Sequence, residues 1–290
     1  MPPETNPTAE LLCRSAFSFQ EGSSLPEQLI DQAGDLGIRH LALTDRDAVY
    51  GLPRAHHRVQ TRLREGLSTP QLICGALLTL EDGPGMALLA RSRTGWSQLC
   101  QLITQSRCKG ELSRDSAPHG REGLRKGWGC TPLQSVLEHS EGLEAILVGS
   151  WSGERACRVQ EAFGEHASLA LTLQLDGKDP LRTARASVLS QQSRLPLVAS
   201  GNVLMHDPGR KALQDVLTCI RLKLRIDEAG RLLEPNSARH LMSPGQMHAR
   251  FAATPQSMER NLEVAERCLF SLDELAYRYP KELIPESHTP

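Results

Sequence analysis

Hydrophobic and polar positions alternate along the chain between two patterns, short apolar runs and longer segments with apolar residues at helical spacing. The apolar runs occupy residues 10–19 (ELLCRSAFSF), 38–45, 70–80, 86–91, 144–150, 168–175 and 195–203. Helical spacing is found at 24–37, about 50–65, 94–106, around 154–163 and around 181–194. Strands that alternate with helices in this way predict an α/β fold, either a barrel or a doubly wound sheet. In both architectures ligands bind at the carboxyl ends of the strands.

Local signals fix some of the predicted boundaries. In the segment 24–37, Ser24 is the candidate N-cap, Pro26 lies in the first turn, Glu27 has the capping-box position, and Gly37 ends the helix. The sequence EDGPG joins the runs 70–80 and 86–91, and this predicts a hairpin.

Two parts of the chain depart from the alternation. Residues 107–131 are rich in Gly, Ser and Arg, and they predict a mobile surface excursion. From about Pro208 the pattern becomes mainly helical, and it ends in the Pro-rich YRYPKELIPESHTP, which is typical of a linker toward a further domain. We therefore expect a β/α unit over 1–207 and a helical extension with linker over 208–290.

Composition and charge narrow the class of protein. Apolar residues make up 39% of the chain and charged residues 23%, which is ordinary for a globular domain. Lys and Arg total 33 against 34 Asp and Glu, for a formal net charge of −1. This balance argues against strong nonspecific binding of the whole chain to nucleic acid or to an anionic membrane.

Targeting and redox signals are absent from the sequence. The eight cysteines are scattered without C-x-x-C spacing, so a zinc knuckle is not expected. We expect buried, reduced thiols instead. The N-terminus lacks the basic and apolar regions of a signal peptide, and no apolar run approaches roughly 18 residues. We expect no membrane span and a reducing cytoplasm.

The strand ends hold the candidate chemistry. Asp45-x-Asp47 follows a short strand and could be a two-metal carboxylate pair, although acidic residues here more often form turns or caps. His206 also follows a strand end, whereas His56 and His57 lie on a basic helical face that we expect to be solvated. No G-x-S-x-G, Walker loop, G-x-G-x-x-G or H-E-x-x-H is present.

Several longer stretches resemble the error-prone branch of the bacterial C-family DNA polymerases, the alpha-subunit relatives of the ImuC type. They include AELLCRSAFSFQEGSSLPEQLIDQAGDLGIRHLALTDRDAVYGLPRAH and LPLVASGNVLMHDPGRKALQDVLTCIR, together with residues 71–104, 238–251 and 268–287. The resemblance implies the N-terminal polymerase-and-histidinol-phosphatase (PHP) domain of such an enzyme. That domain is a distorted seven-stranded, TIM-like β/α barrel, followed here by the mainly helical C-terminal segment.

The same resemblance implies a vestigial metal site. Metal-bearing PHP domains carry H-x-H, then D-H, then Glu, and later D-x-H at their strand ends. The matching positions here are Leu12, Arg14, Asp45, Arg46, Leu77, Asn202 and Leu204. Leucine has no lone pair to offer, and arginine stays protonated and cannot coordinate a cation. A guanidinium about 5 Å from a dication would cost roughly 6 kcal/mol at an effective dielectric of about 20. We therefore expect no catalytic residue and no metal cofactor in this chain.

In place of metals, we hypothesise that Arg14 and Arg46 fill the site and pair with Asp45 or Asp47. Nucleotidyl transfer in the family belongs to palm-domain carboxylates beyond the resembling region. The chain alone is therefore expected to be a non-catalytic scaffold within a translesion polymerase of DNA-damage-induced mutagenesis. The implied partners are the palm and thumb, DNA through the full-length enzyme, accessory mutagenesis proteins and the sliding clamp.

Two alternatives stay open at this point. One is a PHP-type metal-dependent phosphoesterase. The other is a stand-alone truncated interaction protein, which would use the loop 107–131 and the Arg54–Arg64 face to touch DNA or protein.

Overall fold

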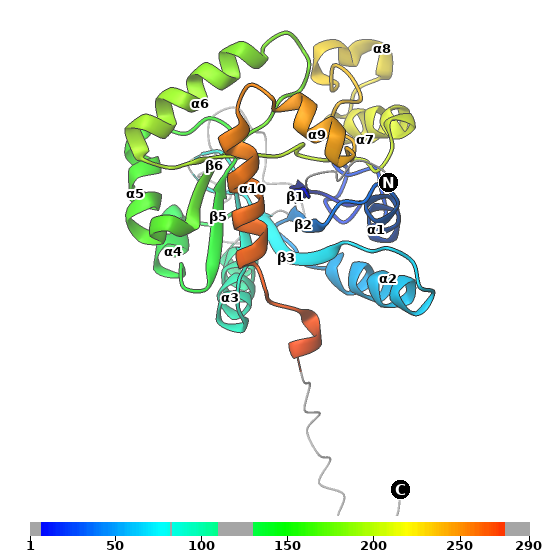
Figure 1. The fold of residues 1–290 in the computed structure, drawn as a ribbon. Coiled ribbons are helices and arrows are strands. Elements are labelled where there is room, and N and C mark those ends of the chain that lie inside the picture. The colour runs from blue at the N-terminus through cyan, green and yellow to red at the C-terminus, as the bar shows by residue number, and fades with distance from the viewer. Residues whose placement is uncertain (1–6, 82, 110–129, 276–290) are drawn as a thin grey trace, which may run out of the picture.

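The computed structural model describes residues 7–81, 83–109 and 130–275, and in these residues it contains one curled seven-stranded sheet with helices around its outer face (Figure 1). The strand order follows the chain, from β1 to β7. The strands are β1 (Ala9–Cys13), β2 (His40–Arg46), β3 (Gln71–Leu78), β4 (Met86–Ala90), β5 (Leu143–Leu147), β6 (Ala167–Leu171) and β7 (Leu197–Ala199). The expectation of a distorted, TIM-like seven-stranded α/β barrel with a helical C-terminal segment is confirmed.

Strand pairing is mostly parallel. β1, β2 and β3 pair in parallel, as do β5, β6 and β7. β4 is antiparallel to both β3 and β5, so the hairpin predicted around EDGPG is present. Helices cover the outside of the sheet, and this explains why β1, β4 and β5 are buried along their whole length.

The helices follow the predicted alternation. They are α1 (Pro26–Asp35), α2 (Leu52–Arg64), α3 (Arg93–Lys109), α4 (Leu133–Glu138), α5 (Gly153–Phe163), α6 (Asp179–Ser193), α7 (Lys211–Leu222), α8 (Ile226–Ala229), α9 (Pro244–Arg250) and α10 (Pro255–Arg267). Short 3-10 helices are η1 (Gly164–His166), η2 (Pro208–Arg210), η3 (Gly230–Leu232) and η4 (Leu272–Glu274). The predicted excursion was wrong at its start, because α3 continues through Arg107 to Lys109. Residues 110–129 of that excursion and the tail 277–290 lie outside the described residues.

The beginning of α1 differs from the prediction, whereas its end agrees. The N-cap is Leu25, whose backbone N–H donates to Oε1 of Gln28 at 3.0 Å, and not Ser24. Ser24 is instead buried, and its hydroxyl lies 2.8 Å from Nδ1 of His206. Gly37 follows the helix with a φ of 73°, a left-handed conformation that glycine adopts without strain.

The two edge strands, β1 and β7, do not pair with each other in the described sheet, and the chain after β7 closes part of this gap. The backbone N–H of Val203 donates to the carbonyl of Leu12 at 2.7 Å, and the N–H of Arg14 donates to the carbonyl of Val203 at 3.0 Å. These bonds hold the carboxyl end of β1 beside the segment that follows β7.

A helix closes the rest of the gap. α10 packs against both β1 and β7, and it crosses in front of the sheet in Figure 1. Its fully buried Asn261 accepts a hydrogen bond from the N–H of Ala9 at 3.0 Å and donates to the carbonyls of Ala9 and Ala199, each at 2.9 Å. One side chain therefore satisfies backbone groups that a closed ladder would have paired.

A buried carboxylate completes the closure. Glu10 accepts from the N–H of Leu12 at 2.9 Å, from the hydroxyl of Ser200, and from the N–H of Gly201 at 2.8 Å. Burial raises the pKa of Glu10, although these hydrogen bonds act in the opposite direction.

No described helix is long and apolar enough to cross a membrane.

Candidate functional site

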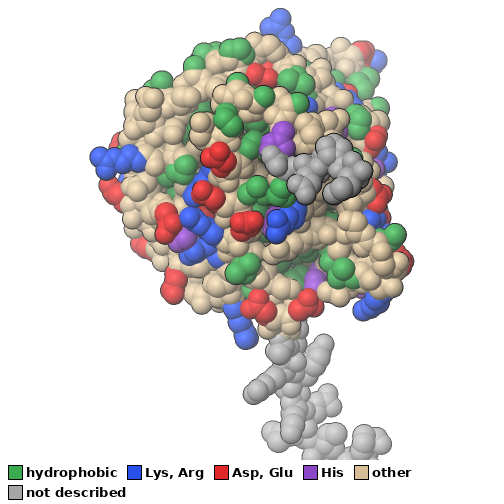
Figure 2. Space-filling view, in the orientation of Figure 1, with side chains coloured by type: hydrophobic (Ala, Val, Ile, Leu, Met, Phe, Trp, Pro, Cys, Tyr) green, Lys and Arg blue, Asp and Glu red, His purple; other side chains and the backbone are tan. Residues whose placement is uncertain are grey.

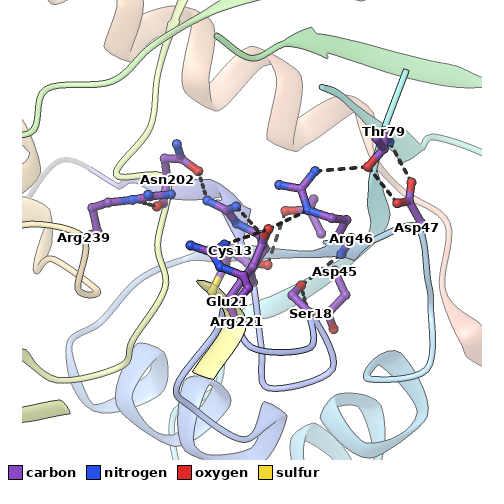
Figure 3. Close-up of polar contacts among 12 residues, drawn as sticks. Cys13, Ser18, Glu21, Asp45, Arg46, Asp47, Thr79, Asn202, Arg221 and Arg239 are labelled. Carbon is purple, nitrogen blue, oxygen red and sulfur yellow. Dashed lines mark hydrogen bonds and ion pairs between the residues drawn. The ribbon is translucent and has the colours of Figure 1, made fainter. Parts of the chain in front are cut away.

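The carboxyl ends of β1 and β2, the turn after β1 and the segment after β7 meet on one side of the barrel (Figure 3). Two guanidiniums from the strand ends converge on one carboxylate. Nη1 of Arg14 donates to Oε2 of Glu21, and Nε of Arg46 donates to Oε1 of the same residue, both at 2.9 Å. Arg221 of α7 adds a third contact, with Nη1 at 3.4 Å from Oε1. We call Arg14, Glu21, Arg46 and Arg221 the Glu21 network.

Charge in the Glu21 network is unequal, with three cations around one anion. Burial disfavours ionisation of Glu21, but the guanidiniums of Arg14 and Arg46 outweigh it and lower the pKa of Glu21 to about 2. Burial and the neighbouring cations of Arg239 and Arg46 lower the pKa of Arg14 to about 10, despite its pairing with Glu21. Glu21 and Arg14 are therefore both charged at neutral pH.

Asn202 extends the network toward β7. Its side-chain oxygen accepts from Nη2 of Arg14 at 2.7 Å, and its backbone carbonyl accepts from Nε of Arg239 at 2.8 Å. The residue has a φ of 51°, a left-handed conformation that asparagine tolerates better than most residues. Asn202 thus accepts hydrogen bonds from two arginines. Its amide oxygen contacts Arg14, and its backbone carbonyl contacts Arg239.

Asp45 is held by hydroxyl and amide donors. Its carboxylate accepts from the N–H and the hydroxyl of Ser15 and from the hydroxyl of Ser18, each at 2.7 Å. Burial raises the pKa of Asp45, and the hydrogen bonds from the two serines oppose this rise. The hydroxyl of Ser18 also accepts from the N–H of Arg46 at 2.9 Å, so this serine joins the end of β2 to the turn after β1.

Asp47 has separate partners from Asp45. Its carboxylate accepts from the N–H of Thr79 at 2.7 Å and from the hydroxyl of Thr79 at 2.8 Å. Its backbone carbonyl accepts from Nη2 of Arg107 at 2.7 Å. The two carboxylates of the Asp45-x-Asp47 motif therefore act as structural acceptors for different segments, in agreement with the turn-and-cap alternative.

The three leucines at predicted metal positions are buried apolar side chains. Leu12 and Leu77 belong to the same hydrophobic cluster in the barrel interior, and Leu204 is 3% exposed. These positions therefore continue the core up to the carboxyl edge of the sheet.

Arg14 and Arg46 both form ion pairs with Glu21, a partner that the hypothesis from the sequence did not name. The carboxylates of Asp45 and Asp47 accept hydrogen bonds from Ser15, Ser18 and Thr79, and the cation of Arg46 opposes the rise in the pKa of Asp47 that burial causes. Sequence reasoning missed Glu21, which lies in the Ser/Gly turn QEGSS directly after β1. A signal was present, because Glu21 is the one acidic residue in the turn 15–24, which directly follows Arg14.

The residues at these positions do not fit a divalent metal. Three of them are leucines, two are guanidiniums held by Glu21, and the oxygens of Asp45 and Asn202 already accept hydrogen bonds from the protein. No group of three or more His, Cys, Asp or Glu side chains with metal-binding geometry exists among the described residues.

The other polar candidates also have structural partners. Burial and the nearby Arg210 lower the pKa of His206, whose ring contacts Ser24. On α2, Arg54 and His57 are exposed as expected, but basic residues of the helix pair with α1: Arg58 contacts Asp31 at 2.6 Å, and Arg62 is 4% exposed and contacts Asp35 at 2.7 Å.

Comparison with known proteins places this site in a family. Residues 10–176 match the PHP domain family, so the chain belongs to that family. Its curated relatives include the error-prone DNA polymerase of Pseudomonas aeruginosa, which is 37% identical over 97% of this chain and 25% of the relative. Error-prone DNA polymerase 1 of Agrobacterium fabrum is 34% identical over 94% of this chain and 24% of that protein. The chain spans about a quarter of the length of these relatives.

Solved structures with a similar fold are more distant. An amidohydrolase from Chromobacterium violaceum is 13% identical over 67% of this chain and 86% of that chain, with a TM-score of 0.43. A lesion-specific endonuclease from Pyrococcus furiosus is 11% identical over 68% of this chain and 48% of that chain, with a TM-score of 0.41.

Proposed function

We propose that this chain is the PHP portion of an error-prone DNA polymerase, and that it serves as a non-catalytic scaffold for the polymerase. The observation that carries this proposal is the Glu21 network, which fills with ion pairs the strand ends where related domains would hold metal ligands. Similarity to error-prone polymerases over nearly the whole chain supports the assignment of the parent enzyme.

The proposed scaffold role has a physical basis in what the network joins. Arg14 follows β1, Arg46 ends β2, Glu21 lies in the turn between β1 and α1, and Arg221 is on α7. A buried ion pair adds little net stability compared with apolar packing, but it is costly to break and can specify one geometry. The network would therefore fix the relative positions of these elements without chemistry.

In the full-length polymerase, this domain would take part in translesion synthesis through the other parts of the enzyme. The palm and thumb, accessory mutagenesis proteins and the sliding clamp remain proposed partners, and the cytoplasm is the proposed compartment. The buried cysteines Cys13, Cys74, Cys219 and Cys268 are free thiols, which suits a reducing compartment.

The surface favours indirect rather than direct contact with DNA. Figure 2 shows Lys and Arg side chains interspersed with Asp and Glu on the face in view, and the formal net charge of the chain is −1. Nonspecific DNA binding requires a concentration of cations that can neutralise phosphates. We therefore propose that DNA is held by the full-length enzyme and not by this chain alone.

Metal analysis and a phosphatase assay test the non-catalytic role. The purified chain is dialysed against Mn²⁺ and Zn²⁺ and then desalted, and bound metal is measured by mass spectrometry; hydrolysis of a phosphomonoester is followed with added Mn²⁺. A PHP protein that retains the H-x-H ligands serves as the positive control. We expect substoichiometric metal and no turnover. Stoichiometric metal that a chelator removes, or robust turnover, would overturn the proposal in favour of a phosphoesterase.

The gene sequence tests the assignment to a polymerase. An in-frame palm domain downstream of Pro290 is the expected result. A stop codon at that point would favour the stand-alone interaction protein.

A further inference from the structure

The helix α7 has its polar and apolar sides reversed relative to a usual surface helix. Gln214 and Thr218 face the protein and are 2% and 1% exposed. Leu213, Val216 and Ile220 face solvent, with exposures of 39%, 44% and 54%. Their spacing of three and four residues aligns them along one side of the helix.

Hydrogen bonds of the buried pair Gln214 and Thr218 explain how the polar side of α7 can lie against the protein. Nε2 of Gln214 donates to the hydroxyl of Thr218 at 3.0 Å, and that hydroxyl donates to the carbonyl of Gln214 at 3.0 Å. The inner side thus satisfies part of its own hydrogen bonding, and Leu213, Val216 and Ile220 are left outside. A contiguous apolar surface on a soluble domain commonly marks an interaction site.

The elements after α7 add to this surface. α8 packs against α7 and exposes Ile226 at 58%, and η3 exposes Leu232 at 59%. We call the exposed apolar side chains of this segment the α7 face; they are Leu213, Val216, Ile220, Ile226 and Leu232.

The charges around the α7 face are mainly positive. Residues 210–232 contain six basic side chains, of which Arg221 reaches inward to Glu21, against the three acidic side chains Asp215, Asp227 and Glu228. Some of the cations are paired within the segment, such as Lys211 with Asp215. A protein surface with an apolar centre and an acidic rim would complement this arrangement.

The comparisons indicate which protein supplies that surface. The α7 face lies outside the PHP family match at 10–176, so it is not a shared feature of the family. The polymerase of Pseudomonas aeruginosa nevertheless matches 97% of the chain, and the unmatched remainder is too short to contain α7. The segment is therefore shared with polymerases, and three quarters of the length of that relative has no counterpart here.

We propose that the α7 face docks the polymerase region that this chain lacks, through an apolar contact with an acidic rim on the partner. This inference rests on the proposed function and names the surface that the scaffold uses. A covalently linked partner is present at high effective concentration, so a contact of modest size is sufficient. DNA is the weaker candidate, because exposed aliphatic side chains gain nothing from a phosphate backbone.

The α7 face is also connected to the barrel site. Arg221 lies on α7 and reaches Glu21 at 3.4 Å. The same helix thus presents its apolar side outward and joins the Glu21 network inward. Docking on α7 would hold the polymerase region in a fixed position relative to the strand ends.

A binding experiment with a matched control tests the surface. The probe is the part of the Pseudomonas aeruginosa relative that this chain does not match, produced as a separate chain. Its competence is verified by its binding to the matching quarter of that relative. The chain is then titrated against the probe as wild type, as Val216→Lys and as Val188→Lys. Val188 is 54% exposed on α6, which lies at the upper left of Figure 1, whereas α7 lies at the upper right.

We expect the two valine substitutions to differ in their effect on the Kd for the probe. Val216→Lys should weaken the Kd by about tenfold or more and Val188→Lys by less than about threefold, as for a central and a non-contacting residue. Equal binding of the wild type and Val216→Lys would contradict docking on the α7 face, but it would not contradict the proposed scaffold role. Failure of the wild type to bind a competent probe would overturn both.

Other occupants give different results in the same series. Tighter binding of a labelled DNA duplex to Val216→Lys than to the wild type, without probe binding, would assign the surface to DNA and overturn the proposal. Concentration-dependent dimerisation of the wild type that Val216→Lys abolishes would assign it to a second copy, with the same consequence.

Discussion

Glu21 is the residue on which the candidate site depends, because it sets one carboxylate against three guanidiniums. Replacement by the isosteric Gln keeps the shape but leaves buried cations without a counter-charge. We expect Glu21→Gln to lower the free energy of unfolding by about 3–5 kcal/mol, the usual range for breaking a buried pair. Urea denaturation followed by circular dichroism measures this. Glu266→Gln is the control, because Glu266 and Arg39 are more than half exposed and 4.0 Å apart; it should cost less than about 1 kcal/mol.

The pKa of Glu21 gives a second prediction at the same scale. Its folded-state pKa of about 2 lies below the unfolded value of 4.5, so ionised Glu21 stabilises the folded state. That contribution is fully present above pH 4.5 and is lost as the pH falls toward 2. It amounts to roughly 3 kcal/mol, from about 1.4 kcal/mol per pKa unit.

The measurement is the difference in unfolding free energy between the wild type and Glu21→Gln at several pH values. Buried carboxyls with raised pKa values, such as Glu10 and Asp45, have the opposite pH dependence but are common to both proteins. The difference should shrink steadily below pH 4.5. A difference that stays constant down to pH 2 would show that Glu21 does not carry this charge.

Among the elements, α10 has the clearest structural task, since its Asn261 satisfies backbone groups at both open edges of the sheet. Asn261→Ala leaves the N–H and carbonyl of Ala9 and the carbonyl of Ala199 without that partner in a buried site. We expect a loss of about 2–4 kcal/mol, because each unsatisfied buried group costs about 1–3 kcal/mol and water replaces some of the contacts.

Thermal and urea unfolding measure this loss, and hydrogen exchange at Ala9 should become faster. Asn236→Ala is the matched control. Asn236 also makes two hydrogen bonds to backbone carbonyls, at Gln174 and Leu175, but in a partly exposed position. It should cost less than half as much as Asn261→Ala. Equal losses would mean that closure of the sheet does not depend on Asn261.

The elements also show how far sequence reasoning reaches. Strand and helix periodicity is local, so the seven strands and their helices were predictable from apolar spacing. Contacts between distant residues are not encoded in such spacing. Asn261 is 252 residues away from Ala9, and Ser24 looked like a helix cap although its hydroxyl contacts His206.

At the candidate site, the sequence predicts which side chains cannot bind a metal, but it does not predict which side chains pair with each other. The lack of lone pairs on Leu12 and Leu77, and the fixed charge of Arg14, follow from the amino acids alone. Which carboxylate pairs with Arg14 depends on the path of the turn 15–24. Asp45 was the closer candidate by strand position, but the hydroxyls of Ser15 and Ser18 occupy it.

For the whole molecule, the contacts of the C-terminal segment indicate that residues 208–275 unfold together with the barrel. α10 closes the sheet, and the ring of Trp96 on α3 stacks with Phe270 at a centroid distance of 5.3 Å. Domains that share a core in this way commonly unfold in one cooperative transition. Trp96 therefore reports on the contact between the barrel and the C-terminal segment.

We expect one urea transition with the same midpoint by far-UV circular dichroism and by fluorescence of a variant in which Trp96 is the sole tryptophan. The variant carries Trp128→Phe and Trp151→Phe, and its midpoint by circular dichroism is compared with that of the wild type as the control. The physical reason is that separating Phe270 from Trp96 also removes α10 from β1 and β7, which exposes backbone groups and the barrel interior at once. A fluorescence transition well below the circular dichroism midpoint would instead show that the segment 208–275 detaches as a separate unit and that the barrel is stable without it.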